Sequence, residues 1–437
     1  MKPRGAVSPR GAGSPVGAAK PRGAVRRALT NLGGPTRTEG DPAAAAILAE
    51  AMNRAATEDP DALTHGFHPW PARMHRAIAG VVIARTTQPG DRVVDPFCGS
   101  GTVLLEAMLA DRKSAGVDLN PIAAELVKVK TDVRTLDERK RFLQTAILVG
   151  EASIERVQSR EPIMAKLPPS MMGLYGVHTL KEMAGLLAEI RTVTDERARR
   201  GLEMVFSSLI VKVSNKRGET AEDGEGRARI RKGLVTEMFV RKCEELTERW
   251  GELADKVGDR ELPTPRVFTG DSLQLREHVK TKVQLVLTSP PYGGTYDYHA
   301  QHALRLAWLG MDARALARSE IGARRRTDDD PQTASKRWDD EVFVMLRAMR
   351  DVIAPEGIVV LLMGDARFGR IERPLIQQLI ESTPRAHLEL VASASQPRPD
   401  WSKGRGMREE HLVMLRGVSR RGGTPRPGPG GGDRRAR

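Results

Sequence analysis

The sequence predicts an α/β fold with a mostly parallel β-sheet and a large helical insertion. Short apolar segments followed by turns and then helical patterns occur in two separate parts of the chain, and a long, charged, helical stretch divides them. Parallel strands need such crossover helices, because the chain must return to the same edge of the sheet before the next strand begins. No repeat of about 20–50 residues is visible, which argues against a solenoid.

Length and composition favour a soluble protein of the cytoplasm. The chain has 437 residues and is 40% hydrophobic, and no apolar run approaches the roughly 18 residues that a membrane-spanning helix needs. The first residues lack the apolar stretch of a secretory signal, and Cys98 and Cys243 are the only cysteines. We therefore expect a reducing compartment and no membrane partner.

The formal net charge of +14 is concentrated at the two ends of the chain. Residues 1–40 contribute +7 and residues 417–437 contribute +5, so that +2 is left for the rest. Both ends are rich in Arg, Pro and Gly, and we predict that residues 1–45 and 417–437 are disordered basic tails. They either attract phosphate groups in a salt-dependent way or only solubilise the chain. A nucleic-acid groove on the nearly neutral remainder needs local clusters of basic residues.

The first strand–turn–helix unit lies in the first third of the chain. An apolar run ends in Asp95, turn-forming residues follow, and a helical pattern comes next. A second buried strand is predicted to end at Asp118, and Asn120 with Pro121 is typical of a helix start. Together these segments form a βαβ unit, and we assign residues 46–130 to the first half of the core.

A helical insertion separates this unit from the second half of the core. Residues 131–262 are charged and helical in pattern, without strand–turn alternation. Strand-like segments return within residues 263–416, which we assign to the second half of the core. The predicted strands of this half lie at 266–271, 283–288, 357–363, 387–393 and 411–416.

A glycine loop follows the first predicted strand. Glycines between a strand and a helix let the backbone approach a ligand closely, and an acidic residue about 20 positions later can bind ribose hydroxyl groups. Asp118 stands nineteen positions after Gly99. The loop lacks the third glycine of ordinary dinucleotide sites and has Asp95 in front of it. A tight turn without a ligand would use the same glycines, so the residues alone leave both interpretations open.

The loop sequence Asp-Pro-Phe-Cys-Gly-Ser-Gly-Thr, residues 95–102, resembles the cofactor loop of the amino-group nucleic-acid methyltransferases. The resemblance implies the Rossmann-like class I methyltransferase fold and S-adenosylmethionine as the cofactor. It also implies that Asp95 lies near the amine-bearing end of the cofactor and that Asp118 accepts hydrogen bonds from the ribose. Asp271 would lie near the adenine, with a helix N-cap as the alternative. The implied cofactor-binding residues are His68, Pro69, Asp95, Pro96, Phe97, Gly99, Ser100, Gly101, Thr102, Asp118, Asn120 and Asp271.

A segment before the loop carries the same resemblance. Residues 65–74, His-Gly-Phe-His-Pro-Trp-Pro-Ala-Arg-Met, are similar to the His-Pro-Tyr-Pro-Ala-Arg segment that lines the methionine end of the pocket in this family. Trp70 stands where tyrosine is more usual. His65 and His68 have a spacing that metal ligands also use, but no cysteine or acidic cluster accompanies them. We therefore predict no metal site.

The candidate catalytic segment is Thr-Ser-Pro-Pro-Tyr, at the end of a later strand. Its prolines must end the strand, and they present carbonyl acceptors without N–H donors. The segment resembles the Ser-Pro-Pro-Tyr of the N4-cytosine methyltransferases. The resemblance implies that the Ser289 hydroxyl and the Pro290 carbonyl accept hydrogen bonds from the two N–H groups of a base amine, so that its nitrogen faces the cofactor methyl group. Pro291 completes the turn, and Tyr292 is expected to stack on a base flipped out of the duplex.

The first residue of this segment distinguishes between substrates. Ser289 favours cytosine N4 in DNA, because N6-adenine enzymes more often carry Asp or Asn there. The alternatives are adenine N6 in DNA and guanosine N2 in RNA. The guanosine N2 enzymes have a similar glycine loop and end their catalytic strand in Asp-Pro-Pro-Tyr. Methylation at cytosine C5 needs a thiolate nucleophile, and neither Cys98 nor Cys243 lies in a suitable segment. A nucleic-acid-binding protein with a degenerate methyltransferase fold is the non-enzyme alternative.

Part of the insertion is a candidate for target recognition. Basic residues surround the glycine-containing stretch 218–226, and such a loop suits contacts to phosphates and guanine edges. Acidic residues partly cancel this charge, so a solvated surface loop is an equal alternative. The expected partner is duplex DNA, a cognate restriction endonuclease is a further candidate, and the oligomeric state stays open. The basic residues are Lys212, Lys216, Arg217, Arg227, Arg229, Arg231 and Lys232.

Overall fold

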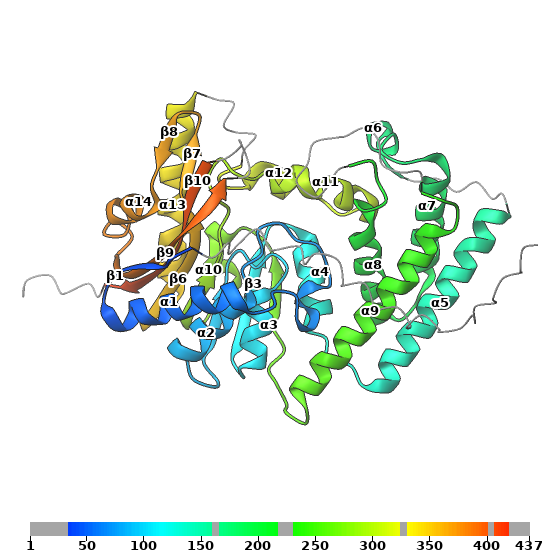
Figure 1. Ribbon diagram of the computed structural model, residues 1–437, viewed down its shortest axis with the longest axis horizontal. Coiled ribbons are helices and arrows are strands. Elements are labelled where there is room, and N and C mark those ends of the chain that lie inside the picture. The colour runs from blue at the N-terminus through cyan, green and yellow to red at the C-terminus, as the bar shows by residue number, and fades with distance from the viewer. Residues whose placement is uncertain (1–33, 160–165, 217–229, 324–329, 401–405, 419–437) are drawn as a thin grey trace, which may run out of the picture.

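The computed structural model describes residues 34–159, 166–216, 230–323, 330–400 and 406–418. Its centre is an eight-stranded sheet with the strand order β1-β9-β10-β6-β5-β2-β3-β4 (Figure 1). The strands are β1 Arg37–Gly40, β2 Arg92–Asp95, β3 Lys113–Asp118, β4 Arg266–Thr269, β5 Val283–Thr288, β6 Ile353–Gly364, β9 Leu388–Asp400 and β10 Gly406–Gly417, and a separate hairpin consists of β7 Ala366–Phe368 and β8 Ile371–Arg373.

The directions of the strands identify the fold. β4, β3, β2, β5 and β6 run parallel, whereas β10 is antiparallel to both of its neighbours, β6 and β9. Among β2–β6, β9 and β10, β10 alone runs against the other strands, which is the class I methyltransferase arrangement. β1 adds a second reversed strand at the edge of the sheet, antiparallel to β9. The predicted fold is confirmed, and the predicted strand at 283–288 coincides with β5.

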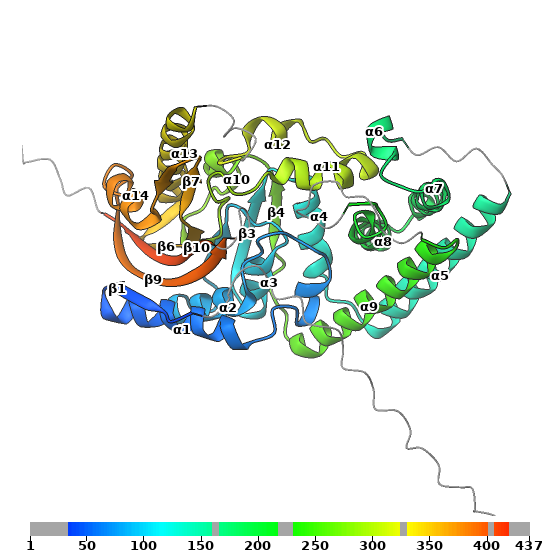
Figure 2. The same ribbon diagram turned by 45° about the horizontal axis from the view of Figure 1, so that its top comes forward.

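Helices cover both faces of the sheet (Figure 2), and residues along each strand alternate between two apolar cores. Leu285 and Leu287 of β5 belong to the core beneath α1, α2 and α3, whereas Val286 belongs to the core beneath α10, α13 and α14. Burial on both faces explains the uninterrupted apolar sequence of this strand. The helices are α1 Pro42–Thr57, α2 Arg76–Thr86, α3 Thr102–Leu109, α4 Pro121–Lys130, α10 Leu275–His278, α13 Pro331–Val352 and α14 Leu375–Ser382.

The predicted insertion forms a helical lobe beside the sheet (Figure 1). Its interior contains the large aromatic side chains Phe142, Phe206 and Trp250, each at most 1% exposed. Its first helix begins with a capping box, in which Thr135 and Glu138 bind each other's backbone N–H groups. The helices are α5 Leu136–Gln158, α6 Pro169–Met172, α7 Val177–Thr192, α8 Glu196–Ile210 and α9 Leu234–Val257.

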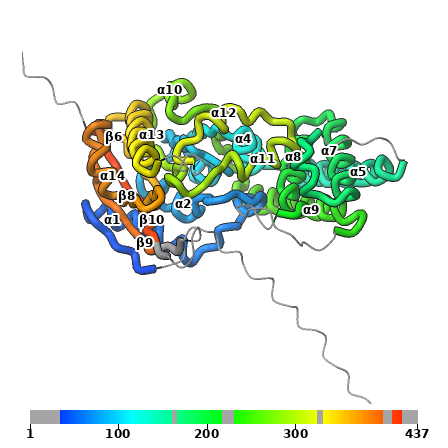
Figure 3. The backbone as a smooth tube through the Cα atoms, turned by 90° about the horizontal axis from the view of Figure 1, so that it is seen from above, coloured from blue at the N-terminus to red at the C-terminus, as the bar shows by residue number. Residues whose placement is uncertain are grey.

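Two further helices connect the lobe with the sheet. α11 (Tyr298–Leu309) contacts α8, and α12 (Arg314–Ser319) follows it. Figure 3 shows this pair passing between α8 and α13. The pair therefore lies over the edge at which β2, β3 and β5 end. Among the described helices, none is both long and apolar enough to cross a bilayer.

The N-terminal tail that the composition predicts up to residue 45 ends earlier, so this boundary is wrong. β1 pairs with β9 inside that segment, and α1 begins at Pro42. The Asp41 carboxylate caps the helix by accepting a hydrogen bond from the Ala44 N–H (2.9 Å), and α1 buries an apolar face against α2 and the sheet. Such an alanine-rich face is not visible in a count of charges. The remainder of the predicted tails, 1–33 and 419–437, lies outside the described residues.

Candidate active site

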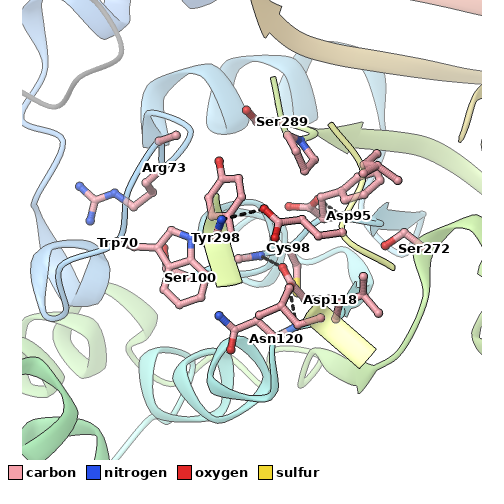
Figure 4. A pocket seen from close by; sticks show the side chains of 18 of the residues that line it. Trp70, Arg73, Asp95, Cys98, Ser100, Asp118, Asn120, Ser272, Ser289 and Tyr298 are labelled. Atoms are coloured by element: carbon pink, nitrogen blue, oxygen red, sulfur yellow. Dashed lines mark hydrogen bonds between the residues drawn. The ribbon is translucent and has the colours of Figure 1, made fainter. Parts of the chain in front are cut away.

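A pocket with an empty volume of about 850 Å³ lies at the carboxyl ends of β2, β3, β4 and β5 (Figure 4). Ligands of open α/β sheets bind at this edge, because the loops that leave the strands form a crevice there. The segment of α11 and α12 supplies a further wall. The lining residues are Trp70, Pro71, Ala72, Arg73, Met74, Asp95, Phe97, Cys98, Gly99, Ser100, Thr102, Val103, Asp118, Leu119, Asn120, Asp271, Ser272, Leu273, Ser289, Pro291, Tyr298, Leu316, Ser319, Glu320 and Ile321.

The glycine loop needs its glycines for backbone conformation and for close packing. Gly99 and Gly101 have φ angles of +45° and +83°, in the left-handed region. A Cβ atom at Gly99 would lie 2.8 Å from Trp70 Nε1, and one at Gly101 would lie 2.7 Å from Val127 Cγ2. The loop therefore lies directly against the segment that precedes it in the sequence and against α4.

Gly101→Ala is expected to destabilise the fold more than Gly90→Ala. Both glycines have similar φ angles, +83° and +85°, so each substitution costs about 1–2 kcal/mol of backbone strain. The methyl group added at Gly101 would meet Val127, whereas one added at Gly90 would have no heavy atom within 4 Å apart from its chain neighbours. The clash at Gly101 adds about 1–3 kcal/mol. Urea denaturation of both variants measures the difference, and equal losses would contradict the packing argument.

Asp95 joins the glycine loop to the catalytic strand. Its Oδ1 accepts hydrogen bonds from the Thr288 hydroxyl (2.6 Å) and from the Phe97 N–H (3.1 Å). Burial, reinforced by the negative charge of Asp118, raises the pKa of Asp95 to about 7. Because Thr288 immediately precedes Ser289, the end of β5 is fixed to the loop after β2.

Asp118 organises the opposite side of the pocket. Its Oδ2 accepts a hydrogen bond from the Gly99 N–H (2.9 Å), and its Oδ1 accepts one from the Asn120 N–H (2.8 Å). Burial raises the pKa of Asp118 to about 6, and the charge of Glu320 adds to the shift. Asp271 lines the pocket and also caps a 3-10 turn, η2 Ser272–Gln274. The same residue is therefore both a helix N-cap and part of the pocket wall.

Several polar groups in the pocket have no partner within the described part of the chain. They are Ser100 Oγ, Thr102 Oγ1 and Asn120 Nδ2, all buried. A buried polar group without a hydrogen bond costs free energy, and exceptions of this kind commonly indicate a ligand or water site. All three residues line the pocket, and Ser100 and Asn120 lie near Asp118 (Figure 4), which indicates that the pocket accepts a ligand with several polar groups.

The catalytic segment is only partly exposed to the pocket. Ser289 and Pro291 line it, whereas Pro290 and Tyr292 are not among the lining residues. Tyr292 is 3% exposed, belongs to the core beneath α13, and donates a hydrogen bond from its hydroxyl to Glu410 Oε1 (2.9 Å). In this position its ring does not reach the pocket in which a stacked base would lie.

The segment before the loop reaches the pocket from Trp70 to Met74, and His68 and Pro69 lie outside it. His68 is buried, and its ring nitrogens bind the Pro69 carbonyl (2.8 Å) and the Ser207 hydroxyl (3.1 Å). Burial lowers the pKa of His68 well below its usual value, so the ring is neutral. Pro96 and Gly101 shape the loop without lining the pocket. Among the described residues, no group of three or more His, Cys, Asp or Glu side chains is arranged to hold a metal ion.

The predicted site residues do not include the wall that α11 and α12 form. Tyr298 and Glu320 line the pocket from this wall, although neither belongs to a motif. Burial raises the pKa of both the Cys98 and the Cys243 thiols well above the usual value, which disfavours a thiolate at either position. Most of the basic stretch of the insertion lies outside the described residues, and Arg231 forms an ion pair with Glu237 (2.6 Å).

Known proteins resemble part of this chain, above all the first half of the core. A family described as DNA methylase matches residues 49–129. The Type II methyltransferase M.BsoBI of Geobacillus stearothermophilus is 24% identical over 52% of this chain and 48% of its own length. M.AvaI of Nostoc sp. is 21% identical over 52% of this chain and 49% of its own. M.Cfr9I of Citrobacter freundii is 51% identical over 9% of this chain and 13% of its own.

The chain thus spans about half the length of the first two relatives. With the fold, the family match makes S-adenosylmethionine the cofactor of this protein. The pocket fits it: carboxylates suit its ribose hydroxyls and its cationic groups, and the unpartnered Ser100, Thr102 and Asn120 side chains supply further hydrogen bonds.

Proposed function

We propose that this protein is a methyltransferase that modifies an exocyclic amino group in DNA, with cytosine N4 as the target. The observation that carries this proposal is the fixed position of Ser289 beside the cofactor loop, through the hydrogen bond between Thr288 and Asp95. The similarity of residues 49–129 to DNA methylases, and of about half of the chain to a Type II methyltransferase, supports a DNA substrate. By the same similarity, a cognate restriction endonuclease is a candidate partner.

The cofactor is proposed to lie along the loops after β2, β3 and β4. Asp118 accepts hydrogen bonds from the ribose hydroxyls, since its carboxylate is already oriented by two backbone N–H groups. Asp95 is close to the amine-bearing end, and Asp271 is close to the adenine. Gly99 permits the close approach of the backbone, and Ser100 and Asn120 gain partners for their side chains.

Ser289 and Pro290 are proposed to activate the target nitrogen. The nitrogen of an exocyclic amine is conjugated with the base and is a weak nucleophile. The chemistry that S-adenosylmethionine supplies is an electrophilic methyl group, whose bond to sulfur breaks with its electron pair as a bond to that nitrogen forms. The Ser289 hydroxyl and the Pro290 carbonyl accept hydrogen bonds from the two amine N–H groups and so orient the nitrogen lone pair toward the methyl carbon. One amine proton then leaves to solvent.

An aromatic side chain is expected to hold the flipped base. Tyr292 is buried and bonded to Glu410, so we assign it to positioning the turn of Ser289. Tyr298 lines the pocket at the start of α11 and is the aromatic residue that we propose for stacking (Figure 4). Stacking of this kind is worth about 1–3 kcal/mol per base in proteins that bind single strands.

Mass spectrometry of nucleosides tests the proposal. DNA and RNA are incubated separately with the purified protein and isotopically labelled S-adenosylmethionine, and Ser289→Ala is the control. N4-methylcytosine in DNA is the expected product. N6-methyladenine would keep the mechanism and change the base, and a product found only in RNA would favour the N2-guanosine alternative. Cofactor binding without any product from either nucleic acid would favour a binding protein.

The pH dependence of folding and of cofactor binding should have opposite signs. Since the pKa values of Asp95 and Asp118 are raised to about 7 and about 6, protonation stabilises the apo protein, and the stability from these groups falls as pH rises from about 4 to about 7. The cationic cofactor prefers ionised carboxylates, so its affinity should rise about ten-fold between about pH 6 and about pH 7.5. Titration calorimetry and thermal unfolding measure the two slopes. An affinity independent of pH would contradict the roles of both carboxylates.

A further inference from the structure

Glu320 brings a further carboxylate to the pocket that Asp95, Asp118 and Asp271 line. It follows α12, is 3% exposed and lines the pocket. Its oxygens accept hydrogen bonds from the N–H groups of Tyr298 (2.7 Å) and His299 (3.2 Å), at the start of α11. These bonds hold the carboxylate against the side of the pocket that faces away from the sheet.

The charge of Glu320 acts on the cofactor loop. It contributes to the raised pKa of Asp118, and Asp118 in turn contributes to the raised pKa of Asp95. Carboxylates that share a buried site disfavour one another's ionised forms. A cation bound among them would remove this repulsion, so the arrangement favours a positively charged ligand over a neutral one of the same shape.

A second observation points to a ligand independently of the carboxylates. Ser100, Thr102 and Asn120 line the same pocket, are at most 4% exposed, and have side-chain polar atoms without a hydrogen-bond partner in the described structure. Such atoms are costly unless a bound molecule satisfies them. The carboxylates and these groups therefore belong to a single ligand site.

We propose that Glu320 is a specificity-determining residue that makes the pocket select the positively charged cofactor over its demethylated product. This inference rests on the proposed function. Both ligands carry an α-ammonium group, but S-adenosylmethionine adds a sulfonium where S-adenosylhomocysteine has a neutral thioether, so that a negative charge close to that position favours the first. In a site shielded from water, unit charges several ångströms apart interact strongly enough to change affinity about ten-fold. The selection would weaken inhibition by the product.

Calorimetry with three ligands tests this role on the full chain. The ligands are S-adenosylmethionine, S-adenosylhomocysteine and sinefungin, an unreactive analogue with a protonated amine near the position of the sulfonium. Glu320→Gln removes the charge and keeps an acceptor for the Tyr298 N–H. We expect about a ten-fold loss of affinity for the two cationic ligands and less than about a two-fold loss for S-adenosylhomocysteine.

Glu341→Gln is the matched control. The Glu341 carboxylate, in α13, accepts a hydrogen bond from the N–H of Gly322 (2.8 Å), which stands two residues after Glu320. Glu341 itself does not line the pocket. We expect this variant to bind all three ligands within about two-fold of the unaltered protein. Unchanged affinities in Glu320→Gln, or equal losses for the charged and the neutral ligands, would overturn the inference and leave the proposed function intact. Failure of the unaltered protein to bind S-adenosylmethionine would overturn both.

Discussion

Ser289→Ala is expected to lower kcat by about 100- to 1000-fold while cofactor affinity changes by less than about two-fold. Ser289 lines the pocket close to Asp95, and we propose that its hydroxyl accepts a hydrogen bond from the target amine. This hydrogen bond strengthens as the nitrogen becomes positive during methyl transfer, so that its loss affects the transition state more than the bound ground state. Single-turnover rates with labelled cofactor measure the first effect, and calorimetry measures the second.

A second substitution at this position separates the loss of an acceptor from a disturbed turn. Ser289→Asp keeps an acceptor for the amine proton and creates the Asp-Pro-Pro-Tyr order that other amino methyltransferases use. We expect it to be at least about ten-fold more active than the alanine variant. An alanine variant with unaltered kcat would show that Ser289 is not the acceptor. A variant that loses cofactor affinity instead would show that Ser289 serves the cofactor.

Asp118→Ala is expected to weaken S-adenosylmethionine binding by about 100-fold or more. Hydrogen bonds to a charged group contribute about 1.5–3 kcal/mol each, and the loss of two of them from the ribose corresponds to this factor. The substitution also frees the Gly99 and Asn120 N–H groups that Asp118 now binds, which loosens the glycine loop. Titration calorimetry gives the affinity, and circular dichroism with thermal unfolding shows whether the variant remains folded.

Asp91→Ala is the control for the loss of a carboxylate at the other end of β2, away from the pocket. The Asp91 carboxylate accepts a hydrogen bond from the Gln88 N–H (2.8 Å) in an exposed turn before β2 and does not line the pocket. We expect its cofactor affinity to stay within about two-fold of the unaltered protein. If Asp118→Ala bound the cofactor as well as this control does, the ribose-binding role would be wrong.

The fold and half of the site could be predicted because their signals are local. A strand that ends in Asp95 and continues into Gly99 and Gly101 has few conformations open to it, and the positive φ angles follow from the residue types. The distance from Gly99 to Asp118 along the chain is set by a single strand–helix–strand crossover. The two prolines that follow Ser289 likewise end β5 at Thr288, whatever the rest of the chain does.

The parts that sequence reasoning missed depend on partners far away in the chain. Tyr292 is buried because Glu410, 118 residues later, accepts a hydrogen bond from its hydroxyl, and because its ring packs against Gly364. His68 is held by Ser207 of the insertion, 139 residues away, which keeps it out of the pocket. No pattern near either residue reveals such a contact.

The sequence by itself thus determined the strands of the sheet other than β1, the glycine loop, the paired acids and the proline-ended strand, since backbone geometry over a few residues specifies each of them. Only the tertiary structure decided which side chains face the pocket. Packing placed Tyr298 and Glu320 in its wall and Tyr292 in the core. Burial and pKa are properties of the whole set of neighbours, and the folded chain assembles those neighbours from segments that are distant in the sequence.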